Sequence, residues 1–198
     1  MRIQLNPWPT FAFVAVVLSW LAFVLTFILH KKPPSPPDKK RDPASITGIV
    51  FQGLSYAPLW MIRRQWFMPM FGSSKFLEIA LAVLTAVLAV ASVWFCAAAV
   101  RTLGVQWSLA ARVVEGHKLV TQGPYSIVRN PIYTGMLGML LATGLAVSHG
   151  IGLVLAVVIF AIGTLIRVRS EERLLREMFG SEFDEYTRRV PAVIPLLI

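Results

Sequence analysis

The chain contains four uncharged, mostly apolar stretches, and their lengths constrain the fold more than any other feature. They cover residues 11–29, 44–62, 79–100 and 132–166. A helix needs about 20 mostly apolar residues to cross a bilayer, and the first three stretches have 19, 19 and 22. The fourth has 35, which as one helix would be about 50 Å long and too long for a single crossing.

A cluster of helix-breaking residues, 148–152, divides this fourth stretch. We therefore expect residues 132–166 to form two short helices in a tight hairpin, which makes five spans in all. Residues 44–62 either form a complete span or re-enter on one side, because three residues weaken them: Gln52, Gly53 and Pro58. The predicted fold class is an all-α integral membrane protein.

Composition supports the membrane class and excludes others. Apolar residues make up 56% of the chain and charged residues 15%, against about 25% charged in an ordinary soluble domain. This composition excludes a disordered chain, and a single cysteine, Cys96, excludes a disulfide scaffold. A net charge of +9 is compatible with nucleic acid, but basic loops facing anionic lipid explain it better in a membrane protein. We expect no nucleic-acid partner.

The basic residues sort to one side of a five-span arrangement. Residues 30–43, 101–129 and the tail from Arg167 together carry 15 of the 19 Lys and Arg residues. Because basic loops stay in the cytoplasm, we expect the N-terminus outside and the C-terminus inside.

Two units are expected along the chain. Residues 1–100 would form three spans joined partly by a Pro-rich loop, 30–43, and residues 101–198 would form the second unit. The second unit includes a charged helix over residues 170–189, whose apolar face has helical spacing. We expect this helix to be amphipathic and to lie beyond the membrane on the cytoplasmic side.

Two polar clusters adjoin the hairpin. The first, residues 117–133, is interrupted by two prolines and Gly123, and irregular backbone at membrane depth must be buried in protein or line a wet cavity. It is therefore either a pocket or an ordinary interfacial loop. In the second cluster, Arg167 and Glu171 are four residues apart and share a helix face, which also suits a routine ion pair. No dinucleotide fingerprint or phosphate loop occurs, and the three histidines lack metal-ligand spacing, so no metal site is expected.

The two clusters together have a recognisable order. GPYSIVRNPIYTG, an apolar hairpin, R-x-x-x-E-E and FGSEFDEYTRRVP follow one another. This order resembles the isoprenylcysteine carboxyl methyltransferase family and the related phospholipid methyltransferases, over about residues 103–195. The resemblance implies that residues 101–198 are a methyltransferase core. It implies a pocket for S-adenosyl-L-methionine without a Rossmann domain, formed by the loop, the hairpin and the C-terminal helix.

The resemblance also assigns residues to roles. It links Arg167 to the acceptor substrate and Glu171 to the cofactor, and these two are the candidate catalytic residues. The implied cofactor-binding positions are His117, Lys118, Leu119, Val120, Tyr125, Asn130, Pro131, Ile132, Tyr133 and Glu171. One position departs from the family, which usually has histidine where this chain has Asn130. Asparagine offers a donor and an acceptor but cannot become charged, so the mechanism or the substrate differs if that histidine moves a proton.

The residues favour one kind of acceptor. A carboxylate is already nucleophilic, and a guanidinium such as that of Arg167 can orient it. An amine acceptor would need a base, and neither cluster offers an obvious one. We therefore expect a lipophilic carboxylate that enters from the bilayer, and the resemblance implies one of the prenylcysteine type. The alternatives are a phospholipid amine N-methyltransferase, an NADPH-dependent enzyme like the sterol reductases, and a non-catalytic membrane subunit.

Overall fold

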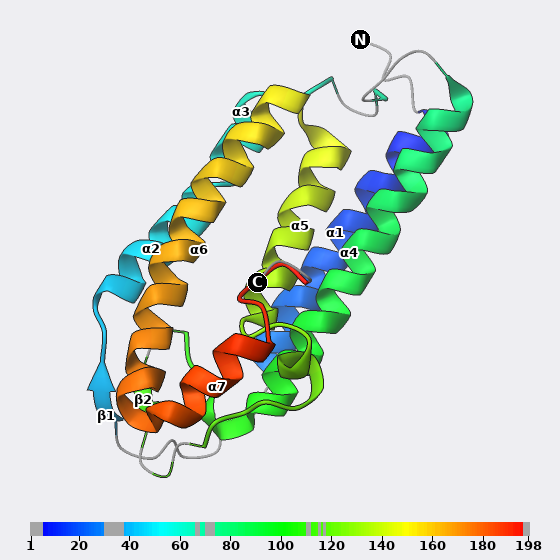
Figure 1. The fold of residues 1–198 in the computed structure, drawn as a ribbon. Coiled ribbons are helices and arrows are strands. Elements are labelled where there is room, and N and C mark those ends of the chain that lie inside the picture. Colours follow the sequence, from blue (N-terminus) through cyan, green and yellow to red (C-terminus); the bar gives the residue numbers. More distant parts are fainter. Residues whose placement is uncertain are drawn as a thin grey trace.

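The computed structural model describes residues 6–29, 38–65, 68–69, 74–109, 112–114, 116 and 118–195. Most of this backbone is helical, and Figure 1 shows long helices lying roughly side by side. The helices are α1 (Pro7–Leu29), α2 (Ala44–Leu54), α3 (Ala57–Met61), α4 (Lys75–Leu103), α5 (Pro131–Val147), α6 (Gly150–Phe179) and α7 (Ser181–Arg189). Short 3-10 helices are η1 (Gly104–Gln106) and η2 (Gly123–Ser126). The expected helical class is thus confirmed for the bulk of the described chain.

A short antiparallel strand pair is the exception to the all-α expectation. Strand β1 (Asp38–Arg41) pairs with β2 (Arg112–Val114). The pairing connects the end of the Pro-rich loop to the segment between α4 and η2. No alternating apolar pattern marks either strand, so the sequence alone did not predict the pair.

Three helices are long and apolar enough to cross a membrane. They are α1, α4 with its η1 extension, and α6, while α5 is a shorter apolar helix of 17 residues. Many of their large apolar side chains are exposed, for example Leu18, Val90 and Val154, as expected for faces that lie against lipid. The predicted break is confirmed, because α5 ends at Val147 and α6 begins at Gly150, but only α5 is short, since α6 has 30 residues.

The irregular stretch 44–62 runs along α6 in one direction. It forms α2 and α3, which are separated by a turn at residues 55–56. Near its start Gly48 approaches Gly163 of α6, and at its end the carbonyl oxygen of Ile62 accepts the N–H of His149 at 3.0 Å. The stretch therefore extends along the membrane part of α6 instead of turning back on itself.

The prediction of a separate charged helix over residues 170–189 is wrong. Helix α6 continues from the hairpin through Phe179 without a break, because no helix-breaking residue follows Ile166 before Gly180. Gly180 has a φ of 52° and ends the helix, and the remaining residues form α7. The amphipathic part is therefore α7, which buries Phe183 and Tyr186.

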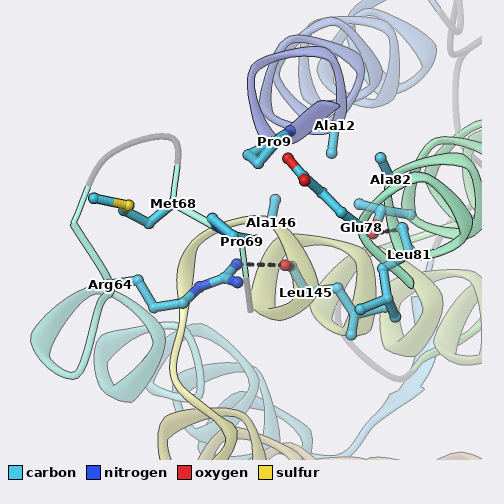
Figure 2. A pocket seen from close by; sticks show the side chains of 11 residues that line it. Pro9, Ala12, Arg64, Met68, Pro69, Glu78, Leu81, Ala82, Leu145 and Ala146 are labelled. Carbon is cyan, nitrogen blue, oxygen red and sulfur yellow. Dashed lines mark hydrogen bonds between the residues drawn. The ribbon is translucent and has the colours of Figure 1, made fainter. Parts of the chain in front are cut away.

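The end of the bundle at the hairpin turn is fastened by Arg64. Its Nη2 donates a 2.6 Å hydrogen bond to the carbonyl oxygen of Leu145, as Figure 2 shows, and its backbone N–H donates to Val147 at 2.9 Å. The last carbonyls of a helix lack intrahelical donors, and a cation is favourable there. Arg64 therefore caps α5 and ties it to the segment after α3. A small pocket lies beside Arg64, and the side chains of Pro9 and Glu78 also line it (Figure 2).

Glycines allow α2 and α6 to touch. A Cβ atom built on Gly163 would lie 2.8 Å from the carbonyl oxygen of Gly48 and 2.9 Å from the backbone nitrogen of Gln52. Backbone atoms cannot move aside as a flexible side chain can. The two helices therefore pack closely only because position 163 has no side chain.

We expect Gly163→Ala to destabilise the protein by about 1–3 kcal/mol, the usual cost of overpacking. The measurement is thermal unfolding in detergent. Gly53→Ala in α2 is the matched control, because a Cβ atom there meets nothing within 4 Å and alanine favours a helix more than glycine does. Equal melting temperatures for the two variants would contradict the packing argument.

Candidate functional site

A cavity of about 630 Å³ lies at the end of the bundle where α4 ends and α5 begins. Its volume falls within the range of small-molecule sites. The amino-terminal part of the chain contributes the lining residues Trp20, Phe23, Phe27, Ile49, Gln52, Gly53 and Tyr56. The remainder of the lining is Leu103, Gln106, Trp107, Ser108, Leu109, Tyr125, Arg129, Asn130, Ile132, Tyr133, Met136, Arg167, Glu171, Leu174 and Leu175.

The cavity brings together most of the residues that the sequence singled out. Tyr125, Asn130, Ile132, Tyr133, Arg167 and Glu171 all line it. Lys118, Leu119, Val120 and Pro131 are not among its lining residues, and Leu119 instead packs against α7. His117 lies outside the described residues.

Tyr133, Arg167 and Glu171 form one interacting group. The Nη2 atom of Arg167 donates to Oε1 of Glu171 at 3.2 Å and to the carbonyl oxygen of Leu109 at 2.5 Å. The hydroxyl of Tyr133 donates to the same Glu171 oxygen, and the guanidinium carbon of Arg167 lies 5.0 Å from the centre of the Tyr133 ring. Both Tyr133 and Arg167 are 5% exposed, so the group places a carboxylate and a cation at a largely buried wall.

The Nε atom of Arg167 is not used within this group. It is buried and has no hydrogen-bond partner among the described residues. An unpaired buried donor is costly, more so on a charged group. Arg167 lines the cavity, so this donor is a candidate for binding a ligand.

Helix α7 holds the loop before α5 in place. The hydroxyl of Tyr186 donates a 2.6 Å hydrogen bond to the carbonyl oxygen of Tyr125. Burial is the main reason that the pKa of Tyr186 is raised to about 12. Burial also raises the pKa of Tyr125, so both phenols stay neutral at physiological pH.

Arg129 is a site residue that sequence reasoning missed. Its Nε donates to Oε1 of Glu172 at 2.9 Å, and its Nη1 donates to the carbonyl oxygens of Thr187 and Val190. It thereby joins the loop, α6 and the end of α7. A signal was available, because Arg129 lies in the first polar cluster and Glu172 directly follows Glu171 of the second.

Asn130 holds the carboxyl-terminal segment. Its backbone N–H and its Nδ2 both donate to the carbonyl oxygen of Ala192, at 2.9 and 3.0 Å. Next to it, Thr134 donates to the carbonyl of Val193 at 2.5 Å, and Arg129 donates its backbone N–H to Pro191 at 2.8 Å. The Asn130 amide is therefore an anchor for the tail, and its Oδ1 is the side-chain atom left for a ligand.

An aromatic wall closes the cavity on the side of α1 and α2. The rings of Trp20 and Tyr56 lie 5.3 Å apart, those of Phe23 and Phe27 4.9 Å, and those of Phe27 and Trp107 5.3 Å. Sequence reasoning assigned no role to these residues. Their spacing at positions 20, 23 and 27, on one helix face, was the available signal.

The segment between β1 and α2 is attached to α6 near the cavity. Asp42, which follows β1, accepts a hydrogen bond from the backbone N–H of Ala44 at 3.0 Å and pairs with Arg173 of α6. Asp42 is 7% exposed. The start of α2 is thus attached to α6 two residues beyond Glu171.

We expect Tyr186→Phe to lower the free energy of unfolding by about 1 kcal/mol at pH 8, because the buried carbonyl of Tyr125 loses its donor. A raised pKa contributes stability that is complete below the unfolded value near 10. That contribution is lost as the pH rises through the folded value of about 12. The difference between the variant and the unmodified protein should therefore shrink from pH 10 upward.

The measurement is thermal unfolding in detergent at pH 8, 10 and 11. Glu185→Gln is the control on the same helix, since its side chain is 67% exposed. A difference for Tyr186→Phe that stays constant with pH would contradict this account.

The chemistry of the donor set suits a small polar cation better than a metal. Among the described residues no three His, Cys, Asp or Glu side chains come together as metal ligands. A single carboxylate next to tyrosine rings can bind an ammonium or sulfonium group by a charge-assisted hydrogen bond and by cation–π attraction. The fold and the site thus define a helical membrane protein with a largely apolar cavity. The charged wall of this cavity suits a small cationic ligand.

A model of the phospholipid methyltransferase family matches residues 79–182. These residues are more than half of the chain, and the chain belongs to this family. The match begins inside α4 and includes α5, α6 and the start of α7. It therefore contains the loop and the Tyr133–Arg167–Glu171 group, and it leaves out α1, α2 and the aromatic residues on them.

Individual relatives are similar to part of the chain. Protein-S-isoprenylcysteine O-methyltransferase B of Arabidopsis thaliana is 35% identical over 83 residues, which are 42% of this chain and 42% of the relative. The enzyme of that name from Schizosaccharomyces pombe is 30% identical over 89 residues, 45% of this chain and 38% of the relative. Cobalt-zinc-cadmium resistance protein CzcN of Cupriavidus metallidurans is 40% identical over 100 residues, which are 48% of this chain and 44% of the relative. The chain thus spans less than half the length of these relatives.

Proposed function

We propose that this protein is an integral membrane methyltransferase that uses S-adenosyl-L-methionine. Its acceptor is a lipophilic carboxylate of the prenylcysteine type. The observation that carries the proposal is the Tyr133–Arg167–Glu171 group at the wall of an apolar cavity, inside the region that matches the family. Two of the relatives are named as methyltransferases of isoprenylcysteine, which supports the same chemistry.

The cofactor half of the site is assigned to the loop and to Glu171. The Glu171 carboxylate suits an ammonium group, and the rings of Tyr125 and Tyr133 suit a positive sulfonium. Ile132 and Asn130 complete this half. Bound S-adenosyl-L-methionine would supply a methyl group on a sulfonium that is ready for in-line displacement.

The acceptor half is assigned to Arg167. Its unpaired Nε–H can donate to a carboxylate, and the planar guanidinium orients that group without removing its nucleophilic electron pair. The Tyr133 ring and the Leu109 carbonyl fix the guanidinium. Positioning and exclusion of water then account for the rate, because a carboxylate has no proton to lose.

An amine acceptor fits this wall less well. It would have to lose a proton to a base, and the carboxylate at hand, Glu171, already accepts hydrogen bonds from Tyr133 and Arg167. The acidic acceptor therefore remains the better match to the residues.

The orientation follows from the distribution of basic residues. We infer five crossings, with the N-terminus outside and the site at the cytoplasmic face, where a polar cofactor is available. Residues 101–198 serve as the methyltransferase core in this proposal, and residues 1–100 complete the wall of the acceptor chamber.

Calorimetric titration of the detergent-purified protein tests the cofactor class. We expect saturable binding of S-adenosyl-L-methionine and no heat from NADPH titrated in parallel. Binding of NADPH alone would move the protein to the reductases. Binding of neither, together with no methylated lipid or peptide by mass spectrometry, would support a non-catalytic subunit.

Variants of the two charged residues test the division of roles. We expect Glu171→Gln to weaken binding of S-adenosyl-L-methionine by about tenfold to a hundredfold, because a hydrogen bond to a charged group is lost. We expect Arg167→Lys to keep most of that binding and to lower kcat by about a hundredfold, since a point charge cannot hold the fixed geometry. Calorimetry and methyl-transfer assays measure the two effects.

Glu185→Gln, at an exposed position of α7, is the matched control. Full activity in both site variants would overturn the assignment. A loss of cofactor binding that is larger for Arg167→Lys than for Glu171→Gln would reverse the two roles.

A further inference from the structure

Gln52 is a buried polar side chain for which the proposed reaction has no use so far. It stands on α2, lines the cavity and is 2% exposed. Its Nε2 donates to Oγ1 of Thr164 at 3.0 Å. Its Oε1 is buried and has no hydrogen-bond partner among the described residues. Buried polar atoms are rarely left unsatisfied, because each one costs about 1–3 kcal/mol.

Gln52 and Arg167 belong to the same seam between α2 and α6. Gly48, one turn before Gln52 on α2, lies directly against the Arg167 side chain. Thr164, the partner of Gln52, lies three residues before Arg167 and on the same face of α6. Gln52 is therefore about one helical turn deeper in the bundle than Arg167.

This wall thus carries two unsatisfied atoms of opposite type. Among the described residues, the Nε donor of Arg167 and the Oε1 acceptor of Gln52 have no hydrogen-bond partner. A ligand that satisfies both needs an anionic oxygen and, a few atoms away, an N–H or O–H group. A simple fatty acid has the first group and lacks the second.

We propose that Gln52 is a specificity-determining residue, whose Oε1 accepts a hydrogen bond from an amide N–H next to the acceptor's carboxylate. This inference rests on the proposed function. An acylated cysteine with a free carboxylate carries an amide N–H on the same carbon as its carboxyl group. Its apolar thioether chain then lies against the aromatic wall of Trp20, Phe23 and Phe27.

The position of Gln52 outside the family match strengthens the inference. The match covers residues 79–182, which hold Arg167 and Glu171, whereas Gln52 comes from α2. The amino-terminal helices thus add selectivity for the acceptor to a matched region that holds the methyl donor and orients the acceptor's carboxylate. A site that reads an N–H rejects an analogue without one, because the buried acceptor is then left unpaired.

Two synthetic acceptors isolate this hydrogen bond. One is N-acetyl-S-farnesyl-L-cysteine, and the other is the same molecule with a methyl group on its amide nitrogen, which removes the N–H donor. We expect the full-length protein in detergent to prefer the first by about tenfold or more in kcat/KM. In Gln52→Met, which has a similar shape and no amide, the preference should fall close to one, with unchanged affinity for S-adenosyl-L-methionine.

Thr85→Val is the matched control. Thr85 is as deeply buried as Gln52, but it lies on α4, is not among the residues that line the cavity, and donates to the carbonyl oxygen of Leu81 in its own helix at 2.7 Å. It should keep the tenfold preference. If Gln52→Met does not bind S-adenosyl-L-methionine, Gln52→Asn replaces it, because this variant keeps a polar group in the seam while withdrawing the oxygen.

The outcomes separate this inference from the proposed function. Equal turnover of both acceptors by the unmodified protein, or a preference that survives in the Gln52 variant, overturns the role of Gln52 and leaves the methyltransferase intact. Turnover of neither acceptor, with saturable binding of S-adenosyl-L-methionine, overturns the prenylcysteine-type acceptor and Gln52 with it. Absence of that binding overturns the proposed function itself.

Discussion

The carboxylate of Glu171 is the point on which the site depends. It accepts hydrogen bonds from Tyr133 of α5 and from Arg167 of its own helix. In a chain that buries little charge, a carboxylate and a guanidinium near the membrane must satisfy each other or meet a ligand. Their pairing holds the start of α5 against α6 and at the same time positions both charges at the cavity. The same interaction therefore stabilises the packing of α5 on α6 and positions the charged groups of the site.

The family core alone does not enclose the cavity. Residues 79–182 supply the loop and the charged wall, while α1 and α2 supply the opposite aromatic side. The close contact of α2 with α6 depends on Gly48 and Gly163, and Asp42 fastens the start of α2 to Arg173. The amino-terminal helices are thus held in register with the charged residues. In the proposed reaction, the amino-terminal helices would therefore add acceptor selectivity to a core that holds the methyl donor.

The hairpin was predictable because its cause is local. A run of 35 uncharged residues is too long for one crossing, and the break falls at the cluster after Val147. The pairing of Arg167 with Glu171 was predictable for the same reason, since a separation of four residues places them on one helix face. The continuation of α6 to Phe179 was missed, because a rise in charge was taken for the start of a new helix. Charge marks where a helix leaves the membrane and not where it ends.

The remaining parts of the site depend on contacts between distant segments. Gln52 meets Thr164 across 112 positions, and Trp20 meets Thr143 across 123. No local pattern encodes such pairs. In the sequence, Gln52 even weakens the prediction that residues 44–62 span the membrane, because a polar residue is unfavourable in a membrane helix. In the folded chain that same residue lines the cavity, as expected when polar groups within a membrane face the protein interior.

Asn130 shows what a departure from a family pattern can mean. In the sequence its role was open, because asparagine replaces a histidine and cannot carry a proton. In the structure its amide N–H and its backbone N–H bind the same carbonyl of Ala192. An amide keeps that donor at every physiological pH, whereas an imidazole changes its donors on titration. The tail across the start of α5 is therefore held independently of pH. That favours a positioning role at this residue over proton transfer, in agreement with an acceptor that has no proton to give up.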